Sequence, residues 1–419
     1  MLASGYADVV MKLWLKYAFG IVTGAVLFLA LPPSMAKGTA FIAFLNDIAL
    51  RMGGYAFILT LAAGLPGAVF HLSEARHMNR LAGFAIALFI GSLFATAAIG
   101  TMAGLLTVPA PLPLTVEVAA APAPSVQDLM YSIFPRSVFS VLSLSESWIL
   151  PLFVFMFAFG LAIAHDPVIS RPLIPIIDVV SRASYLINTF IAEVLGILLI
   201  PVTLQTLILF RASPIPAEYR RLLAVVLILS FIFFAGLFPL LYRLLGGRKN
   251  PYLLLYGMTG PLLAAALSGN LLFAGGTGLK HVAENLGVKR NANSLAFPIA
   301  FIAGRAGTAL IASVAFISMY LSYSRSGPGL FQVLSIVLAV VLSVLTCASG
   351  MNAGIISVIS LASVLFGRGF QSGAALLVPV ALPLSFAASL LDMEWITYMT
   401  MLSAERLGLA ETKRPRNFI

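Results

Sequence analysis

Long apolar runs separated by short polar segments dominate the chain from residue 13 onward. A helix that crosses the hydrocarbon core of a bilayer needs about 20 largely apolar residues. The pattern therefore predicts an all-α membrane protein that spans the bilayer many times. Spans are predicted over residues 13–31, 39–69, 81–108, 129–164, 184–210, 222–245, 294–320 and 374–402. The run 129–164 contains Pro135 and a polar SLSESW segment, which predict a broken span.

Two further apolar runs, 251–277 and 330–366, are interrupted by small and polar residues. The first is predicted to break at Ser268, Gly269 and Asn270 and again at Gly275-Gly276. The second contains the segment ASGMNAG, with Ser349, Gly350 and Asn352. Interrupted segments in corresponding positions indicate a transporter binding site, because free helix ends can hold anions or cations. The alternative is that the glycines only allow helices to pack closely.

Composition supports the membrane class, since 60% of the 419 residues are hydrophobic and only 10% are charged. The net charge of +10 is explained by basic loops on one side of the membrane, so no nucleic-acid partner is predicted. This bias places both termini and the loop at Arg76 in the cytoplasm and the Pro/Ala-rich linker 109–128 outside. Arg211, Arg220 and Arg221 fit this orientation poorly.

The chain shows no sequence motif of a hydrolase, zinc protease or phosphate-binding loop, which argues against an enzyme. Its four histidines are predicted to be solvated in polar loops. The lone cysteine, Cys347, excludes an internal disulfide.

A few charged residues fall within predicted spans, where a charge is costly and usually finds a partner or a watery cavity. Asp47 and Arg51 are one helical turn apart and are predicted to form a local ion pair. Glu193 is predicted to be structural. Asp392 continues a helical stripe that contains Ser385 and Ser389, and this stripe is predicted to face a cavity. Glu394 lies on another face and could sit near the membrane interface.

Arg305 lies between two glycines in the apolar stretch AFIAGRAGTALIA, residues 300–312. Three roles remain open for it. The guanidinium could pair with Asp392, could anchor a substrate carboxylate with its planar fork, or could be a tethered cation where other proteins bind a metal ion.

The chain resembles the dicarboxylate/amino acid:cation symporters, the glutamate-transporter family. The segments VAENLGVKRNANSLAFPIAFIAGRAGTAL (282–310) and MYSIFPRSVFSVL (130–142) carry the resemblance, together with Leu391-Asp392-Met393. The resemblance implies eight transmembrane helices, two re-entrant helical hairpins, a homotrimer and an elevator-like motion of a transport domain. It also implies that Asp392, Thr308 and the second hairpin tip contribute to substrate binding.

The resemblance also implies that several site positions have changed. Gly304 stands where the family has an asparagine, and Ala306 and Ser403 stand where it has sodium-site aspartates. Trp395 replaces the arginine that recognises a side-chain carboxylate, and Met399 replaces a substrate-holding asparagine. The serine-rich first tip corresponds either to Leu271–Phe273 or to Ser268, Gly269 and Asn270. These changes predict weak or absent sodium coupling and a larger, more apolar pocket.

The predicted function is secondary transport of a small organic solute, such as an amino acid, a dicarboxylate or a related amphiphile, across the cytoplasmic membrane. No cofactor is predicted, and Na⁺ or H⁺ is the possible coupling ion. The alternative is a solute-binding membrane protein or receptor on the same scaffold that is either non-transporting or facilitative. The predicted organisation is scaffold spans over 1–108, the linker, spans 4 to 6 over 129–250, a transport core over 251–409 and a basic cytoplasmic tail over 410–419. The third span belongs either to the scaffold or to the moving core.

Overall fold

The computed structural model describes residues 12–31, 36–76, 78–107, 112, 131, 137, 139, 141, 149–324, 327–347, 354–367, 369–370 and 373–419. The first half of the chain forms α1 (Leu13–Ala30), α2 (Ala36–Glu74), α3 (Met78–Thr107), α6 (Leu150–His165), α7 (Pro167–Ser170), α8 (Ile174–Ala212), α9 (Arg220–Ile232) and α10 (Phe238–Leu244). The second half forms α11 (Pro251–Gly257), α12 (Thr259–Ser268), α13 (Leu271–Glu284), α14 (Arg290–Ala303), α15 (Ala306–Tyr323), α16 (Leu330–Cys347), α17 (Ile355–Phe366) and α18 (Ala381–Arg406). Over these ranges the only β pairing is an isolated bridge between Val288 and Ala410.

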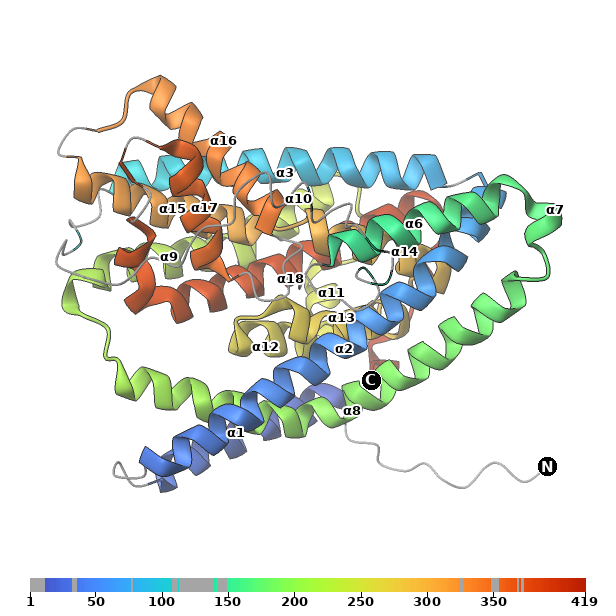
Figure 1. Cartoon of the computed structure of the whole chain (residues 1–419), viewed down its shortest axis with the longest axis horizontal. Coiled ribbons are helices and arrows are strands. Elements are labelled where there is room, and N and C mark those ends of the chain that lie inside the picture. Colours follow the sequence, from blue (N-terminus) through green and yellow to red (C-terminus); the bar gives the residue numbers. More distant parts are fainter. Residues whose placement is uncertain are drawn as a thin grey trace.

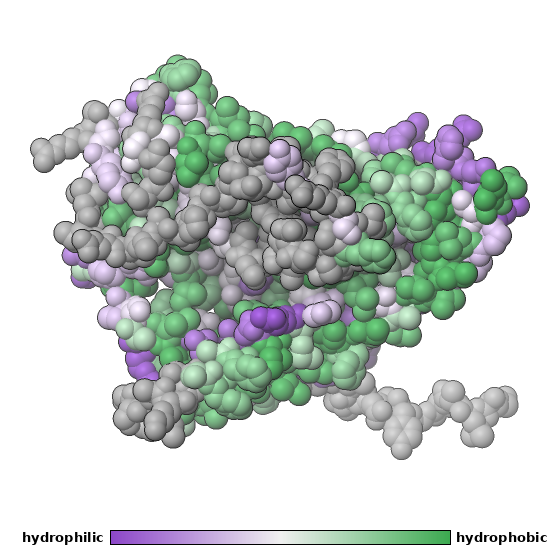
Figure 2. Space-filling view, viewed as in Figure 1, coloured by the Kyte–Doolittle hydropathy of each residue, from purple (hydrophilic) through white to green (hydrophobic). Residues whose placement is uncertain are grey.

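Eight helices within the described ranges are long and apolar enough to cross a membrane. Seven coincide with predicted spans, and the eighth, Leu330–Cys347, is the first arm of the second interrupted run. Of the predicted fourth span, the structure describes chiefly α6. Large apolar side chains such as Leu186 and Phe231 are exposed, and hydrophobic residues cover much of the visible surface (Figure 2). The prediction of an all-α polytopic membrane protein is confirmed.

Two groups of helices build the molecule. Helix α8 packs against both α1 and α2 along one side, whereas α18 runs through the interior among α12, α14 and α15 (Figure 1). Every side chain of α15 from Ala306 to Tyr320 is buried. A helix that is apolar all round, as this one is, must be enclosed by others.

The first interrupted run forms a helical hairpin. Helices α11 and α12 meet at a 70° bend, and α12 ends at Gly269, whose φ of +60° suits glycine. Asn270 then begins α13 by accepting a hydrogen bond from the Leu272 N–H at 2.9 Å. The predicted second break at Gly275-Gly276 is wrong, because α13 runs through it. A Cβ at Gly276 would lie 2.5 Å from Asn188 Oδ1, so this glycine serves close packing.

The predicted seventh span is broken, which the apolar pattern does not show. Helix α14 ends at Ala303, Gly304 and Arg305 leave the helical conformation, and α15 starts at Ala306. The tip of the second hairpin, with Ser349, Gly350 and Asn352, lies outside the described residues.

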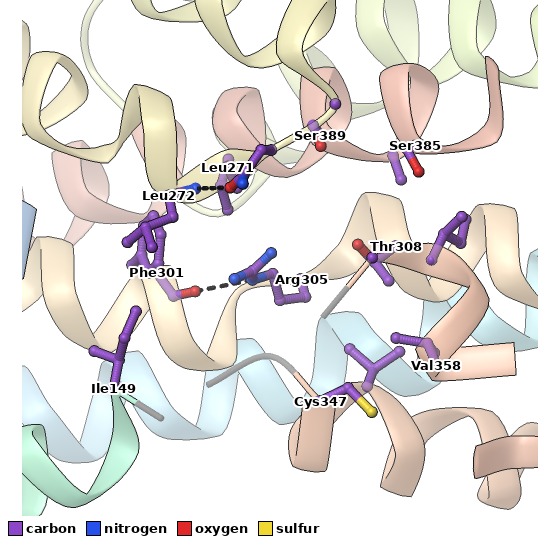
Figure 3. Close-up of a pocket in the computed structure, with 16 residues that line it drawn as sticks. Ile149, Leu271, Leu272, Phe301, Arg305, Thr308, Cys347, Val358, Ser385 and Ser389 are labelled. Atoms are coloured by element: carbon purple, nitrogen blue, oxygen red, sulfur yellow. Dashed lines mark hydrogen bonds between the residues drawn. The ribbon is translucent and has the colours of Figure 1, made fainter. Parts of the chain in front are cut away.

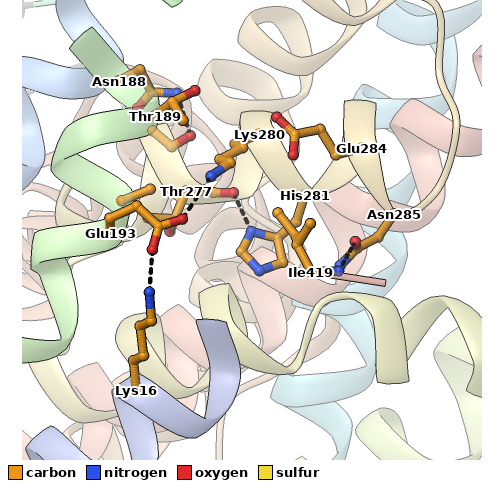
Figure 4. A network of polar contacts seen from close by, with 12 residues as sticks. Lys16, Asn188, Thr189, Glu193, Thr277, Lys280, His281, Glu284, Asn285 and Ile419 are labelled. Atoms are coloured by element: carbon orange, nitrogen blue, oxygen red, sulfur yellow. Dashed lines mark hydrogen bonds and ion pairs between the residues drawn. The ribbon is translucent and has the colours of Figure 1, made fainter. Parts of the chain in front are cut away.

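A polar network joins α1, α8 and the first hairpin (Figure 4). Glu193 on α8 pairs with Lys16 on α1 and, at 3.4 Å, with Lys280 on α13. The side chain of Lys280 is only 3% exposed. His281 beside it is also buried, so the prediction that the histidines are solvated is wrong for this residue. Asp47 and Arg51 form the predicted local ion pair at 2.8 Å.

Replacing Glu193 with Gln is expected to lower stability, because the buried Lys280 ammonium loses its carboxylate partner. Glu193 is itself 38% exposed, so water screens part of the loss and the expected cost is about 1–2 kcal/mol. Thermal unfolding of the purified protein in detergent measures the change. Asp47→Asn is the control, because it breaks an exposed pair and should have almost no effect. Equal shifts for both variants would contradict a structural role for Glu193.

Candidate functional site

A cavity of about 100 Å³ lies where the two hairpins, the break between α14 and α15, and α18 meet (Figure 3). A water molecule needs roughly 10–15 Å³ on this measure, so the space admits several waters or a small solute. Its walls combine apolar side chains with polar groups. The described lining residues are Ile149, Gly269, Asn270, Leu271, Leu272, Phe301, Arg305, Thr308, Val344, Cys347, Gly354, Ile355, Val358, Ser385, Ala388 and Ser389.

Arg305 is the one charged residue among these described lining residues. Its Nε donates a hydrogen bond to the Phe301 carbonyl at 3.1 Å, and its guanidinium lies 5.1 Å from the centre of the Phe301 ring. The break in the seventh span leaves the last carbonyls of α14 at this point, and a cation is stabilised at a helix C-terminus. The main chain thus holds the guanidinium at the cavity wall, with its side chain 13% exposed.

Asp392 lies behind the cavity and is fully buried. Its two carboxylate oxygens accept hydrogen bonds from the Thr308 N–H at 2.9 Å and from the Thr308 hydroxyl at 2.5 Å. Thr308 is in the first turn of α15, so a carboxylate on α18 caps the N-terminus of a neighbouring helix. Arg305 Nη1 is 3.9 Å from Asp392 Oδ2, at the limit of an ion pair. The Asp392 carboxylate therefore holds the start of α15 in place and lies close enough to offset part of the charge of the Arg305 guanidinium.

Besides Arg305, Asn270 and Thr308, the polar part of the wall includes two serine hydroxyls and the start of α17. Ser385 and Ser389 lie one turn apart on α18 and line the cavity. Neither hydroxyl has a hydrogen-bond partner among the residues that the structure describes. Helix α17 starts at Ile355, and both Ile355 and the preceding Gly354 line the cavity, so the positive end of this helix also meets it. The wall offers hydrogen-bond donors and positive charge, which suits an anionic or polar group on an otherwise apolar solute.

The structure brings together some of the predicted site residues and separates others. Gly269, Asn270, Arg305 and Thr308 line the cavity, whereas Ser268 lies just outside it, with its hydroxyl bonded to the Ala264 carbonyl at 2.7 Å.

The two replaced substrate positions on α18 do not line the cavity. Trp395 donates from Nε1 to the Ser92 hydroxyl at 3.0 Å and packs on Phe238, so it turns toward α3 and α10. Met399 is fully buried. Neither side chain therefore makes the cavity larger or more apolar.

The positions that the resemblance relates to sodium binding carry no acidic groups. Ala306 is buried, Gly304 packs against Phe89, and Ser403 is buried on α18. Within the described parts of the chain, no three side chains of His, Cys, Asp or Glu are grouped to hold a metal ion.

Sequence reasoning missed several wall residues. Phe301 supplies both the carbonyl and the ring that position Arg305, and its spacing of one helical turn from Arg305 was the available signal. Cys347, Ile355 and Val358 come from the two arms of the second hairpin.

The comparison with known families agrees with this architecture. The sodium:dicarboxylate symporter family matches residues 10–405 of the chain, which is nearly its whole length. No individual curated protein matches the chain. The chain therefore belongs to the sodium:dicarboxylate symporter family, whose members are multi-pass membrane transporters of small molecules.

Proposed function

We propose that this protein is a secondary transporter for a small organic solute with one carboxylate and an apolar or neutral remainder, such as an amino acid or a related amphiphile. The observation that carries the proposal is the Arg305 guanidinium, held by the break of a transmembrane helix at the wall of a cavity that has both polar and apolar lining residues. A guanidinium binds a carboxylate through two parallel hydrogen bonds. A dicarboxylate is the less favoured substrate, because the described lining residues include no cationic side chain besides Arg305.

The surrounding groups support one bound carboxylate rather than a purely structural ion pair. Asp392 already receives two hydrogen bonds from Thr308, and its distance of 3.9 Å from Arg305 Nη1 is long for a pair of this kind. The start of α17 adds positive potential at the cavity wall. The hydroxyls of Ser385 and Ser389 can bind an amino or hydroxyl group of the solute.

The transport cycle is proposed to follow the elevator motion that the family resemblance implies, in a homotrimer of the cytoplasmic membrane with both termini inside. Helices α11 to α18, within the predicted transport core 251–409, would form the moving part, and α1, α2 and α8 would belong to the scaffold. Helices α15 and α18 pack together and have no extensive contact with the described parts of α1, α2 or α8, which supports this division, whereas α2 packs on α13 and α14 across the proposed boundary.

Uptake by proteoliposomes tests the proposal. A panel of amino acids, dicarboxylates and hydroxy acids is first screened for thermal stabilisation of the purified protein. The stabilising solute is then offered, in radiolabelled form, to liposomes with and without the protein. Accumulation or exchange is expected. Binding without flux would show that the protein is a receptor on a transporter fold.

Sodium coupling is proposed to be weak or absent. A sodium ion needs a cage of oxygen ligands, and Ala306 and Ser403 bring no carboxylate to the positions where the resemblance places such ligands. The neighbouring guanidinium of Arg305 would also repel a cation. Protons, exchange or the solute gradient alone would then drive transport.

Replacing sodium with choline on both sides of the proteoliposomes is expected to leave the initial uptake rate unchanged. The same exchange on a sodium-dependent transporter in matched liposomes is the control for the assay. A steep sodium dependence would contradict the absence of coupling, but it would leave the transporter proposal intact.

A further inference from the structure

A second polar cavity, of about 270 Å³, lies at the other end of α14 from the substrate cavity. It is enclosed by the C-terminal part of α2, the N-terminal part of α8 and the first turns of α14. Glycines of α2 let the other two helices approach, since a Cβ at Gly64 would lie 3.2 Å from the Ser294 hydroxyl. Its polar lining consists of Ser181, Arg182, Arg290, Asn291 and Ser294, with His71 and Asp178 at one side.

This cavity has an excess of positive charge over its carboxylate. Arg290 is partly buried and donates from Nη2 to the Ser181 hydroxyl at 2.5 Å. No carboxylate lies within 4 Å of Arg290 or Arg182 in the described part of the chain, although both guanidinium groups and the Asp178 carboxylate line the same cavity. Asp178, the single acidic lining residue, faces His71 at 3.5 Å.

Arg182 is exposed and Arg290 is partly buried, so water solvates part of their charge. Asp178 is the one acidic residue among the described lining residues, and an oxyanion between the two arginines would balance the positive charge that Asp178 leaves. The flanking hydroxyls of Ser181 and Ser294 and the amide of Asn291 add hydrogen-bond donors, and the N-terminus of α14 adds positive potential. These donors suit a tetrahedral oxyanion, because its oxygens accept several hydrogen bonds from different directions.

We propose that this cavity binds a phosphate group, supplied either by an anionic lipid headgroup or by free inorganic phosphate. The cavity lies near the end of the molecule where the exposed Arg76 and Arg80 connect α2 to α3, and Figure 2 shows hydrophilic surface there. With this end of the molecule at the membrane boundary, a headgroup phosphate would lie beside the cavity.

The bound phosphate would join the two groups of helices. Arg182 and Ser181 belong to α8, whereas Arg290 and Ser294 belong to α14. Helix α14 has 14 residues and ends beside Arg305, so about 21 Å of continuous helix separates the two cavities. An anion at its start would hold α14 against α8 and bias the position of the substrate cavity.

Thermal unfolding of the purified full chain tests the site without any transported solute. Sodium phosphate is compared with sodium chloride at equal ionic strength and pH, and nanodiscs of phosphatidylglycerol are compared with nanodiscs of phosphatidylcholine. Stabilisation by inorganic phosphate identifies the free anion, and stabilisation only by phosphatidylglycerol identifies the lipid. Either result supports the site if it depends on Arg290.

Arg290→Gln is expected to weaken phosphate or lipid binding by at least about tenfold, because a charge-assisted hydrogen bond is lost. Arg171→Gln is the matched control, since Arg171 is exposed near the start of α8 and does not line the cavity. If Arg290→Gln does not fold, Ser181→Ala removes one donor with little structural change and should weaken binding severalfold. The proposal is overturned if neither phosphate nor phosphatidylglycerol stabilises the unaltered chain, or if stabilisation survives both variants.

Discussion

Arg305→Ala is expected to weaken solute binding by about 100-fold, or about 3 kcal/mol, while the protein still folds. The guanidinium is the only charged group on the described cavity wall, so no nearby side chain can replace it for a carboxylate. The break that positions it is held by Asp392 and Thr308 and remains in the variant. Titration of the stabilising solute, followed by calorimetry or by thermal shift, measures the change.

Two further variants separate this role from a general effect of charge. Arg305→Lys keeps the charge but loses the planar fork, so its affinity should fall between those of the alanine variant and the unaltered chain. Arg51→Ala removes an exposed arginine and should bind normally. Normal binding by Arg305→Ala would remove this residue from the recognition of the solute.

Asp392→Ala is expected to have the largest effect on stability, about 3–5 kcal/mol. The change leaves the Thr308 N–H and hydroxyl buried without their acceptor, and it removes the nearest described carboxylate from Arg305. The start of α15 would then lose its cap, and the break would lose its defined geometry. The midpoint of thermal or denaturant unfolding in detergent measures the loss.

Asp392→Asn keeps the shape of the side chain and should be milder, because its amide oxygen can still accept one of the two hydrogen bonds. The double variant, Asp392→Asn with Arg305→Gln, should lose less free energy of unfolding than the two single variants lose in sum, because the pair is then neutral. Simple additivity would show that the two residues do not interact. Asp47→Asn, at an exposed pair, is the control for loss of a carboxylate.

The apolar pattern predicts the helices well because the membrane imposes length and hydrophobicity on each span. The turn at Gly269 was also predicted, since its polar neighbours interrupt the run. A glycine does not by itself indicate a break in a helix, however. Gly275 and Gly276 lie inside a continuous helix and serve packing against α2 and α8, whereas Gly304 adjoins a real break that the apolar run conceals. Whether a glycine serves close packing or adjoins a break depends on the residues that it faces, and these are set by the tertiary fold.

The sequence predicts a residue of the candidate site only where that residue stands out from its neighbours along the chain. Arg305 is conspicuous in an apolar stretch, and Ser385 and Ser389 follow a helical stripe. The cap that Asp392 places on α15 joins residues 84 positions apart, and only the fold brings them into contact. Trp395 has the right position along α18 but turns toward Ser92, because the helix directs that side chain away from the cavity.

The wall of the substrate cavity also includes Cys347, and the chain contains no other cysteine. A maleimide adduct on the unaltered chain therefore labels a single known place, without any engineered background. Cys347 is only 3% exposed, so its labelling rate measures how often reagents enter from the surrounding water. Protection by a candidate solute would report occupancy directly, and a fluorophore at the same sulfur would follow opening and closing in real time.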